Sequence, residues 1–249
     1  MLRSAVSGRP LALAGLALAA ALLSAGPAFA GKRHTVWAYP PGAGPRGAVE
    51  AETWVTATRP SRAEGTDAEY RLEIENGLED GLSLDVYLAV LKQPAGEKLS
   101  FDRMQASLRA DLLRSRFTAI DLTGYFELKR DVDFGNPWEF EAIFIGGKQY
   151  GAFEYDFNLV YESEISAKAF QKDTRELKGI VGAGWNLSPR IFAGAELVAE
   201  DDTGTRELSL GPTLSFGLTE TTWLAVGTQF GVNNAADQLA VRAIFGIFF

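Results

Sequence analysis

Long segments of strictly alternating apolar and polar residues constrain this fold more than any other feature of the sequence. In residues 207–218, every even-numbered residue from Leu208 to Leu218 is apolar, and every odd-numbered residue from Glu207 to Gly217 is polar or glycine. Successive side chains of a β-strand point to opposite faces of the sheet. The segment therefore predicts a strand with one apolar and one polar face.

The same alternation recurs from residue 48 to the C-terminus. It divides the chain into twelve predicted strands, although Trp54 and Ile143 interrupt the polar faces of the first and sixth and leave ten or fourteen strands as alternatives. The predicted strands cover residues 48–58, 67–76, 81–92, 100–113, 118–130, 136–146, 150–163, 174–187, 190–200, 206–218, 222–232 and 237–249.

The length of these segments favours a membrane protein. Strands of soluble proteins average about 5–6 residues, whereas these run about 10–14, close to the roughly 9–11 residues of a tilted transmembrane strand. In a membrane barrel the apolar faces contact lipid and the polar faces line the lumen, which agrees with a mean hydropathy of only -0.02. The predicted fold is all-β, a transmembrane antiparallel up-and-down β-barrel of about twelve strands.

Aromatic residues on the apolar faces support this assignment, because amphipathic rings prefer the headgroup zone of a membrane. The predicted register places them near the two rims of the barrel. One group contains Tyr70, Trp138 and Tyr161, and the other contains Phe144, Phe153, Trp185, Phe216 and Phe249.

The first thirty residues have the organisation of a secretory signal peptide. Arg3 and Arg9 precede a short apolar run over residues 11–23, and residues 28–30 read Ala-Phe-Ala, a small-x-small cleavage site. We therefore predict export through the Sec pathway and removal of residues 1–30. Removing two arginines and no acid would change the formal charge from -8 to -10.

Residues 31–46 are rich in glycine and proline. We predict a flexible periplasmic tail here, followed by the barrel over residues 47–249; an even number of strands would place both termini in the periplasm. In the alternative, the tail enters the lumen and His34, Trp37 and Tyr39 occlude its mouth.

The last strand ends on a C-terminal phenylalanine with apolar residues at every second position. Phe245, Ile247 and Phe249 all fall on its apolar face. This ending resembles the signal by which the outer-membrane barrel assembly machinery recognises its clients. The resemblance implies that this machinery is a partner of the chain.

The turns carry a second resemblance. Residues 75–84 read Glu-Asn-Gly-Leu-Glu-Asp-Gly-Leu-Ser-Leu, and residues 184–190 and 217–224 repeat the order of a small residue, a leucine and a polar turn. This pattern is similar to that of the barrels grouped as the MetA-pathway phenol-degradation or transporter family. Gly and Asn in these turns also permit the positive φ that tight hairpins need.

Composition excludes several classes of function. The chain has no cysteine and one histidine, His34, which excludes disulfide scaffolds, zinc fingers and thiol nucleophiles and argues against metal centres and a Ser-His-Asp triad. Its negative charge argues against nucleic-acid partners, which require a basic surface. We predict no cofactor and no bound metal.

The predicted lumen is acidic. Glu50, Glu52, Glu73 and Glu75 share one half of the first hairpin, and four neighbouring carboxylates cannot all ionise cheaply without nearby cations. One interpretation, which we favour, is a salt-bridge network that fills the lumen; the other is a cation-selective constriction. The basic partners proposed for the cluster are Arg71, Arg109 and Arg242.

These features predict a Gram-negative outer-membrane barrel that is a passive channel or transporter for small molecules of unknown identity. Its surroundings would be outer-membrane lipid and lipopolysaccharide. The alternative is a closed structural or adhesion-type barrel without transport. A hydrolase is a weaker prediction, because the barrel segments contain no histidine to serve as a base; we therefore do not expect an enzyme.

Overall fold

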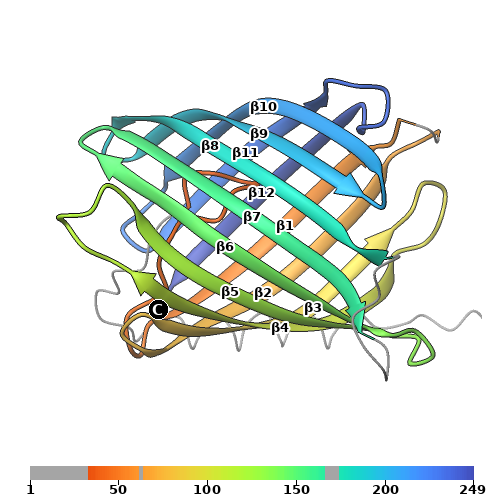
Figure 1. The fold of residues 1–249 in the computed structure, drawn as a ribbon, viewed down its shortest axis with the longest axis horizontal. Helices are drawn as coiled ribbons and strands as arrows, with labels where there is room; N and C mark the ends of the chain where they lie inside the picture. The colour runs from red at the N-terminus through yellow and green to blue at the C-terminus, as the bar shows by residue number, and fades with distance from the viewer. Residues whose placement is uncertain (1–32, 62–63, 166–173) are drawn as a thin grey trace, which may run out of the picture.

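A computed structural model describes residues 33–61, 64–165 and 174–249 (Figure 1). Twelve strands form one closed barrel, in which each strand pairs antiparallel with its neighbours in the chain and the first strand pairs with the last. The predicted all-β, up-and-down barrel of twelve strands is therefore confirmed. The predicted signal peptide lies outside the described residues.

The strands agree closely with the alternating segments of the sequence. They are β1 (Val49–Arg59), β2 (Asp67–Glu79), β3 (Leu82–Gln93), β4 (Ser100–Leu113), β5 (Asp121–Asp131), β6 (Trp138–Tyr150), β7 (Phe153–Ile165), β8 (Glu176–Ser188), β9 (Ile191–Asp202), β10 (Thr205–Gly217), β11 (Thr222–Gly231) and β12 (Leu239–Phe248).

The largest difference concerns the sixth strand, which was predicted to end at residue 146 and continues to Tyr150. The predicted link between the sixth and seventh strands begins at Gly147, but Gly147 lies within the strand. A Cβ there would stand 2.5 Å from Asp156 Oδ1 and 2.6 Å from the carbonyl oxygen of Tyr155. The turn instead follows at Gly151, whose φ is 60°. Close packing therefore accounts for the glycine that sequence reasoning assigned to a turn.

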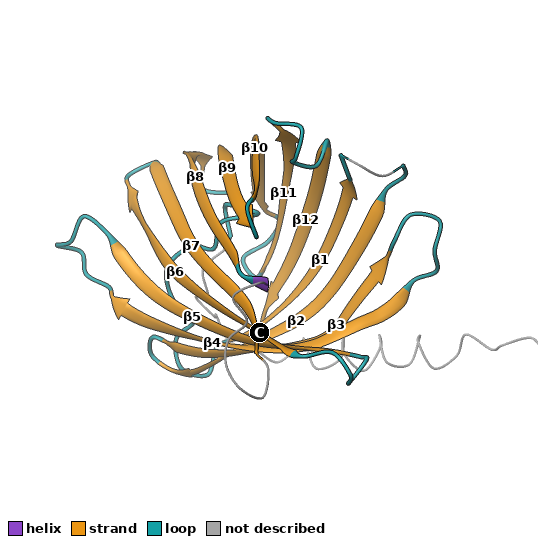
Figure 2. Cartoon of the chain, turned by 45° about the vertical axis from the view of Figure 1, so that its right-hand side comes forward, coloured by secondary structure: helices purple, strands orange, loops and turns teal. Residues whose placement is uncertain are grey.

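The two ends of the barrel differ in their connections. We call the end at which β1 begins and β12 ends the turn end, since residues 80–81, 151–152 and 189–190 form short links there. The opposite end, which we call the loop end, carries longer connections such as residues 94–99 and 232–238. Two connections depart from this pattern: residues 114–120 form a long link at the turn end, and residues 203–204 form a short one at the loop end. The turn end lies at the left of Figure 1. Figure 2 shows that the connecting loops lie at the two ends of the strands.

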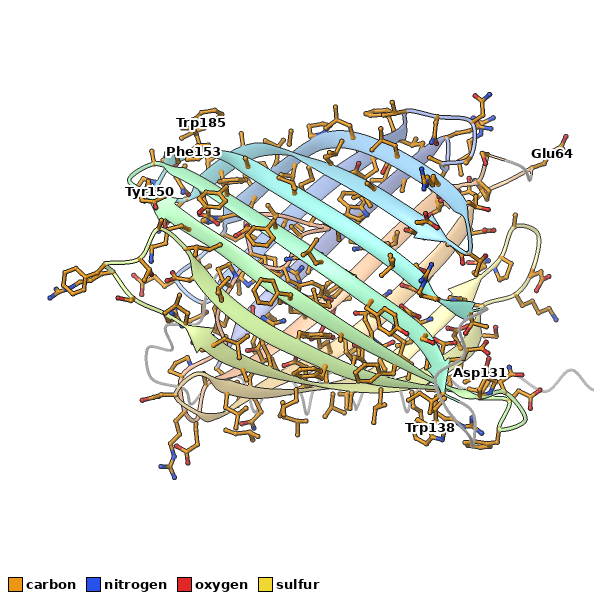
Figure 3. All side chains as sticks on the ribbon, in the orientation of Figure 1. Glu64, Asp131, Trp138, Tyr150, Phe153 and Trp185 are labelled. Atoms are coloured by element: carbon orange, nitrogen blue, oxygen red, sulfur yellow. The ribbon has the colours of Figure 1, made fainter. Side chains whose placement is uncertain are left out.

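The outer surface of the barrel is apolar. Leu88, Phe126 and Leu159 are each more than half exposed on it, as a lipid-facing surface requires. Trp138 lies at the loop end, whereas Phe153 and Trp185 lie at the turn end, in the two groups that the sequence predicted (Figure 3). Among the described residues, no helix is both long and apolar enough to cross a membrane.

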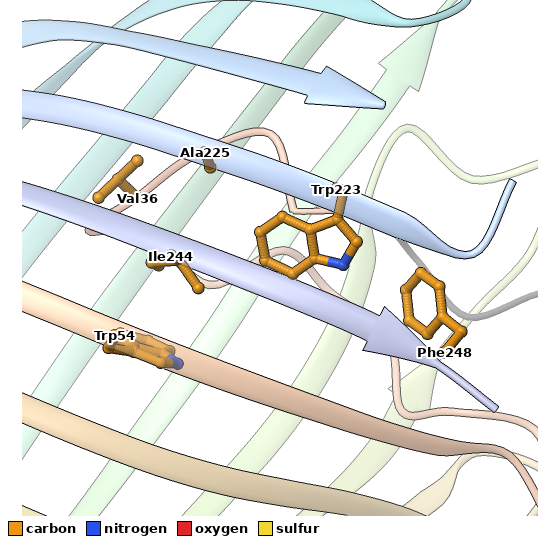
Figure 4. Packing of buried hydrophobic residues seen from close by; sticks show 6 residues of the cluster. All are labelled: Val36, Trp54, Trp223, Ala225, Ile244 and Phe248. Atoms are coloured by element: carbon orange, nitrogen blue, oxygen red, sulfur yellow. The ribbon is translucent and has the colours of Figure 1, made fainter. Parts of the chain in front are cut away.

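Residues 33–46 lie inside the barrel, and we call them the lumen segment. Val36 and Ala38 are fully buried, and Val36 packs with Trp54, Trp223 and Ile244 in an apolar cluster inside the barrel (Figure 4). The flexible tail predicted for residues 31–46 is therefore wrong over these residues. Glycine and proline do prevent regular structure here, but side chains of the barrel wall supply the hydrogen bonds that fix the segment.

Candidate functional site

One buried carboxylate holds the lumen segment in place. Glu196 of β9 is 1% exposed. Its Oε2 accepts a hydrogen bond from the backbone N–H of Val36 at 2.9 Å, and its Oε1 accepts from the N–H groups of Trp37 and Ala38 at 2.8 Å each. A carboxylate accepts several bonds at once, so Glu196 satisfies three consecutive backbone donors. Sequence reasoning missed this residue, because apolar neighbours on both sides of it disguise the polar face of its strand.

Further polar side chains continue the path of the segment across the lumen. Asn158 of β7 accepts from the N–H of Tyr39 at 2.6 Å and donates to its carbonyl at 2.9 Å. The N–H of Ala43 donates to Asp111 of β4 at 2.9 Å. The segment thus crosses from β9 past β7 to β4 before the chain enters β1 (Figure 1).

Glycines on the lumen face of the wall provide the space for this path. A Cβ on Gly182 would lie 2.7 Å from the Thr35 methyl group, and one on Gly227 would lie 2.6 Å from the Trp37 ring. Real side chains essentially never approach so closely. These glycines are a second signal of an occupied lumen in the sequence, beside the ring side chains of the segment itself.

The four predicted acidic residues do lie together at the turn end. Glu50, Glu52 and Glu73 are at most 6% exposed, and the antiparallel register places Glu50 opposite Glu75 and Glu52 opposite Glu73. Two of these carboxylates accept hydrogen bonds from tryptophan side chains. Trp223 Nε1 donates to Glu50 at 2.7 Å, and Trp54 Nε1 donates to Glu52 at 2.8 Å.

The bases around this cluster differ from those predicted. Arg109 is a partner, with its guanidinium 3.9 Å from Glu75. The second partner is Arg33 of the lumen segment, 3.6 Å from Glu52, which sequence reasoning missed because it assigned the segment to the periplasm. Within the described part of the chain, neither Glu50 nor Glu73 has a base within 4.0 Å, so the salt-bridge network is incomplete.

Arg71 and Arg242 were predicted as partners of the acidic cluster, and neither forms an ion pair with it. Arg71 pairs with Glu69 at 2.6 Å. Arg242 donates to Thr56 Oγ1 at 2.9 Å and to the carbonyl of Val36 at 3.4 Å. Both are paired or bonded further along the strands, toward the loop end, which is why they miss the cluster.

The lumen segment lines polar cavities toward both ends of the barrel. The turn-end cavity, of about 400 Å³, is lined by the acidic cluster together with Arg33 and Pro41. Toward the loop end, one cavity of about 330 Å³ includes Tyr39 in its wall, and another of about 220 Å³ includes Trp37.

Acids and bases are closely paired in the loop-end half. The Lys129 ammonium lies 2.8 Å from both Glu141 and Glu162. Lys178 likewise bridges two carboxylates, Glu176 at 2.7 Å and Glu200 at 3.0 Å. Lys129 and Lys178 thus each neutralise at least two carboxylates in this half of the lumen.

His34 enters the lumen with the segment, although the strands contain no histidine. Its Nδ1 lies 2.7 Å from Glu154 Oε2, and its ring stacks on Phe192 at 4.8 Å. Among the described residues, no hydroxyl oxygen bonds to this ring, and no group of three or more acidic or histidine side chains is arranged to hold a metal ion. The contacts of His34 with Glu154 and Phe192 are those of a packed side chain that anchors the segment.

The predicted assembly signal lies on the outside of the barrel's closing strand. Phe245 is 36% exposed, whereas its neighbour Ile244 is fully buried in the lumen. Ile247 falls on the same face as Phe245, and the N–H of Phe249 donates to the carbonyl of Val49 at 3.0 Å. Recognition of these residues by an assembly machinery stays a prediction.

No family model matches the sequence, and no curated protein matches it. Solved structures do match the fold. The COG4313 outer membrane channel from Pseudomonas putida F1 has a TM-score of 0.63 at 13% identity, over 86% of this chain and all of that one.

Two porins show the same likeness more distantly. The NanC porin has a TM-score of 0.56 at 6% identity, over 81% of this chain and 98% of that one. The KdgM porin has a TM-score of 0.53 at 12% identity, over 81% and 99%. These likenesses confirm the predicted fold, that of a bacterial outer-membrane barrel.

Proposed function

We propose that this chain is a passive outer-membrane channel for small molecules, whose flux is limited by its own lumen segment. The observation that carries the proposal is the set of polar cavities on both sides of this segment, within a closed barrel whose outside is apolar. A barrel evolved only as a structural element has no need of polar cavities of about 400 and 330 Å³. The similar channel and porins support this assignment.

The proposal includes the setting of the protein. The chain is exported through the Sec pathway, loses residues 1–30, and inserts into the outer membrane with its turn end and both termini toward the periplasm. Short periplasmic turns and longer outer loops are the usual pattern of such barrels. Outer-membrane lipid and lipopolysaccharide surround it, and the assembly machinery recognises its last strand. None of its residues is assigned a catalytic role.

The same lumen segment gives weight to the second candidate, a closed structural or adhesion-type barrel without transport. Hydrogen bonds of the kind that Glu196 and Asn158 make would keep the segment in place permanently if none of them opened. Conductance in planar lipid bilayers separates the two candidates. We expect discrete small steps from the refolded protein, and steps several-fold larger after deletion of residues 33–46. A barrel that is folded and inserted but silent in both forms would exclude the channel.

The acidic cluster should give the channel a preference for cations, because the turn-end cavity is lined by seven carboxyl groups against four arginine and lysine side chains. Glu73 is the residue of choice for a test, since its Oε2 is buried without a hydrogen-bond partner. Glu73→Gln should lower the cation preference measured as a reversal potential in a KCl gradient. Glu139→Gln, at the loop end, is the matched control and should change it less. Equal reversal potentials for the wild type and Glu73→Gln would contradict a selective role for the cluster.

A further inference from the structure

Arg242 is an exception among the bases that line the lumen cavities. Nine of the other bases in the described cavity walls have a carboxylate within 4.0 Å, and Arg242 has none. The nine are Arg33, Arg71, Lys92, Arg103, Arg109, Arg114, Lys129, Lys148 and Lys178.

The surroundings of Arg242 neutralise its charge poorly. Its guanidinium carbon lies 5.2 Å from the Trp37 ring and 5.4 Å from the Trp54 ring. Its hydrogen bonds go to the neutral acceptors Thr56 Oγ1 and Val36 O. Cation–π contacts and neutral acceptors contribute less than a paired carboxylate does. A partly buried guanidinium without a paired anion is unfavourable, so this position favours binding of one.

A cavity of about 220 Å³ lies directly against this guanidinium. Its volume is below the roughly 300–1,000 Å³ of pockets for drug-sized ligands, which limits the ligand to a few heavy atoms. Hydroxyl groups of Thr58 and Ser209 and the amide of Gln229 line it beside Arg242. These groups supply hydrogen bonds to an anion and to the water around it.

The other walls of the cavity restrict the type of anion. Trp37, Val198 and Ala240 give it an apolar side that suits a short alkyl group. Glu200, Glu207 and Asp237 also line it and would repel a doubly charged ligand. Its second base, Lys178, already has Glu176 and Glu200 as partners. The planar fork of a guanidinium matches a carboxylate with two parallel hydrogen bonds.

We propose that Arg242 and the cavity against it form a binding site for a small organic monocarboxylate at the loop-end side of the lumen segment. The carboxylate pairs with the free edge of the guanidinium, and the alkyl group lies against Trp37. The site adds a ligand class to the proposed channel, but binding itself does not require that the barrel conduct.

Binding can be measured in the full-length mature protein refolded in detergent, since Trp37 and Trp54 flank the guanidinium and report on it. We expect sodium butyrate to change the tryptophan fluorescence saturably at constant ionic strength, whereas sodium chloride and neutral butyramide leave it unchanged. Arg242→Gln should weaken butyrate binding at least tenfold. Arg242→Lys keeps the charge but loses the fork, and should bind with intermediate affinity.

Lys129→Gln is the matched control. It removes a base from the neighbouring loop-end cavity, where Lys129 already has carboxylate partners, and it should change butyrate affinity less than twofold. Folding of each variant is checked by the heat-modifiable mobility of the barrel on gels. Equal responses to chloride and butyrate would mean an adventitious ion only, and unchanged affinity in a folded Arg242→Gln barrel would overturn the site. A protein that binds butyrate but conducts in no form would refute the channel and leave this site standing.

Discussion

The two halves of the lumen satisfy their carboxylates in different ways. In the loop-end half, acids pair with bases, as Lys129 does with Glu141 and Glu162. On the other side, acids bind the lumen segment. Glu196 accepts three of its backbone N–H groups, and Asp111 accepts the N–H of Ala43.

This difference teaches that an acidic barrel wall does not need an equal number of basic residues. A backbone segment offers one N–H donor per residue, and a buried carboxylate that accepts several of them is well stabilised. Part of the excess of acid in this chain, 32 Asp and Glu against 24 Lys and Arg, therefore serves as hydrogen-bond acceptors for the lumen segment. Substitutions in the two halves should therefore release the lumen segment to different extents, and Glu196 should matter most.

The largest effect is expected from Glu196→Ala. It leaves three buried backbone donors without an acceptor, at a cost of roughly 1–3 kcal/mol for each unsatisfied group, so the segment should leave the lumen. Chymotrypsin should then cut after Trp37 in the folded barrel, and the single-channel conductance should rise several-fold. Glu139→Ala is the control, because that acid lines the loop-end cavity and does not bond to the segment. Full protection of Trp37 in Glu196→Ala would show that the carboxylate is dispensable.

Gly227→Leu should release the segment less completely. The new side chain would meet the Trp37 ring, since even a Cβ would approach it to 2.6 Å, and overpacking of this kind costs about 1–3 kcal/mol. The same proteolysis measures the effect. Gly179→Leu is the matched control on the lipid face of β8, where a Cβ would meet nothing closer than 4.0 Å. Equal cleavage in the two variants would argue against close packing of the Trp37 ring on Gly227.

Lys129→Gln should change ion selectivity and leave the segment in place. It removes the base shared by Glu127, Glu141 and Glu162, so the loop-end cavity becomes more negative. We expect the reversal potential in a KCl gradient to shift toward stronger cation preference, with the ratio of K⁺ to Cl⁻ permeability raised about twofold. Protection of the segment from chymotrypsin should be unaltered. Release of the segment in this variant would break the distinction between the two halves.

The smallest effect is expected from Arg46→Ala, at the end of the segment. Arg46 and Glu79 form an ion pair at 3.6 Å in which both side chains are more than 60% exposed, and such pairs contribute between 0 and about 1 kcal/mol. Conductance and proteolysis should match the wild type. The free energy of unfolding in urea should change by less than about 0.5 kcal/mol. A larger loss would mean that this end of the segment is as strongly held as residues 36–38.

Much of the barrel wall could be predicted from the sequence, because the alternation that defines a strand is local. The same pattern placed Glu50, Glu52, Glu73 and Glu75 together, since antiparallel neighbours in a hairpin follow from the register. The partners of these acids could not be predicted in the same way. Arg33 reaches Glu52 only because a segment without any strand pattern turns back into the lumen.

The sequence by itself therefore indicated a barrel of about twelve strands, the face that most residues of a strand occupy and the acidity of the interior. Only the tertiary structure decided what occupies that interior. Val36 and its acceptor Glu196 are 160 residues apart in the chain, and they meet because the closed barrel brings β9 around to the N-terminal residues. No local pattern records such a contact, since it depends on the closure of the whole sheet and on the space that Gly182 and Gly227 leave open.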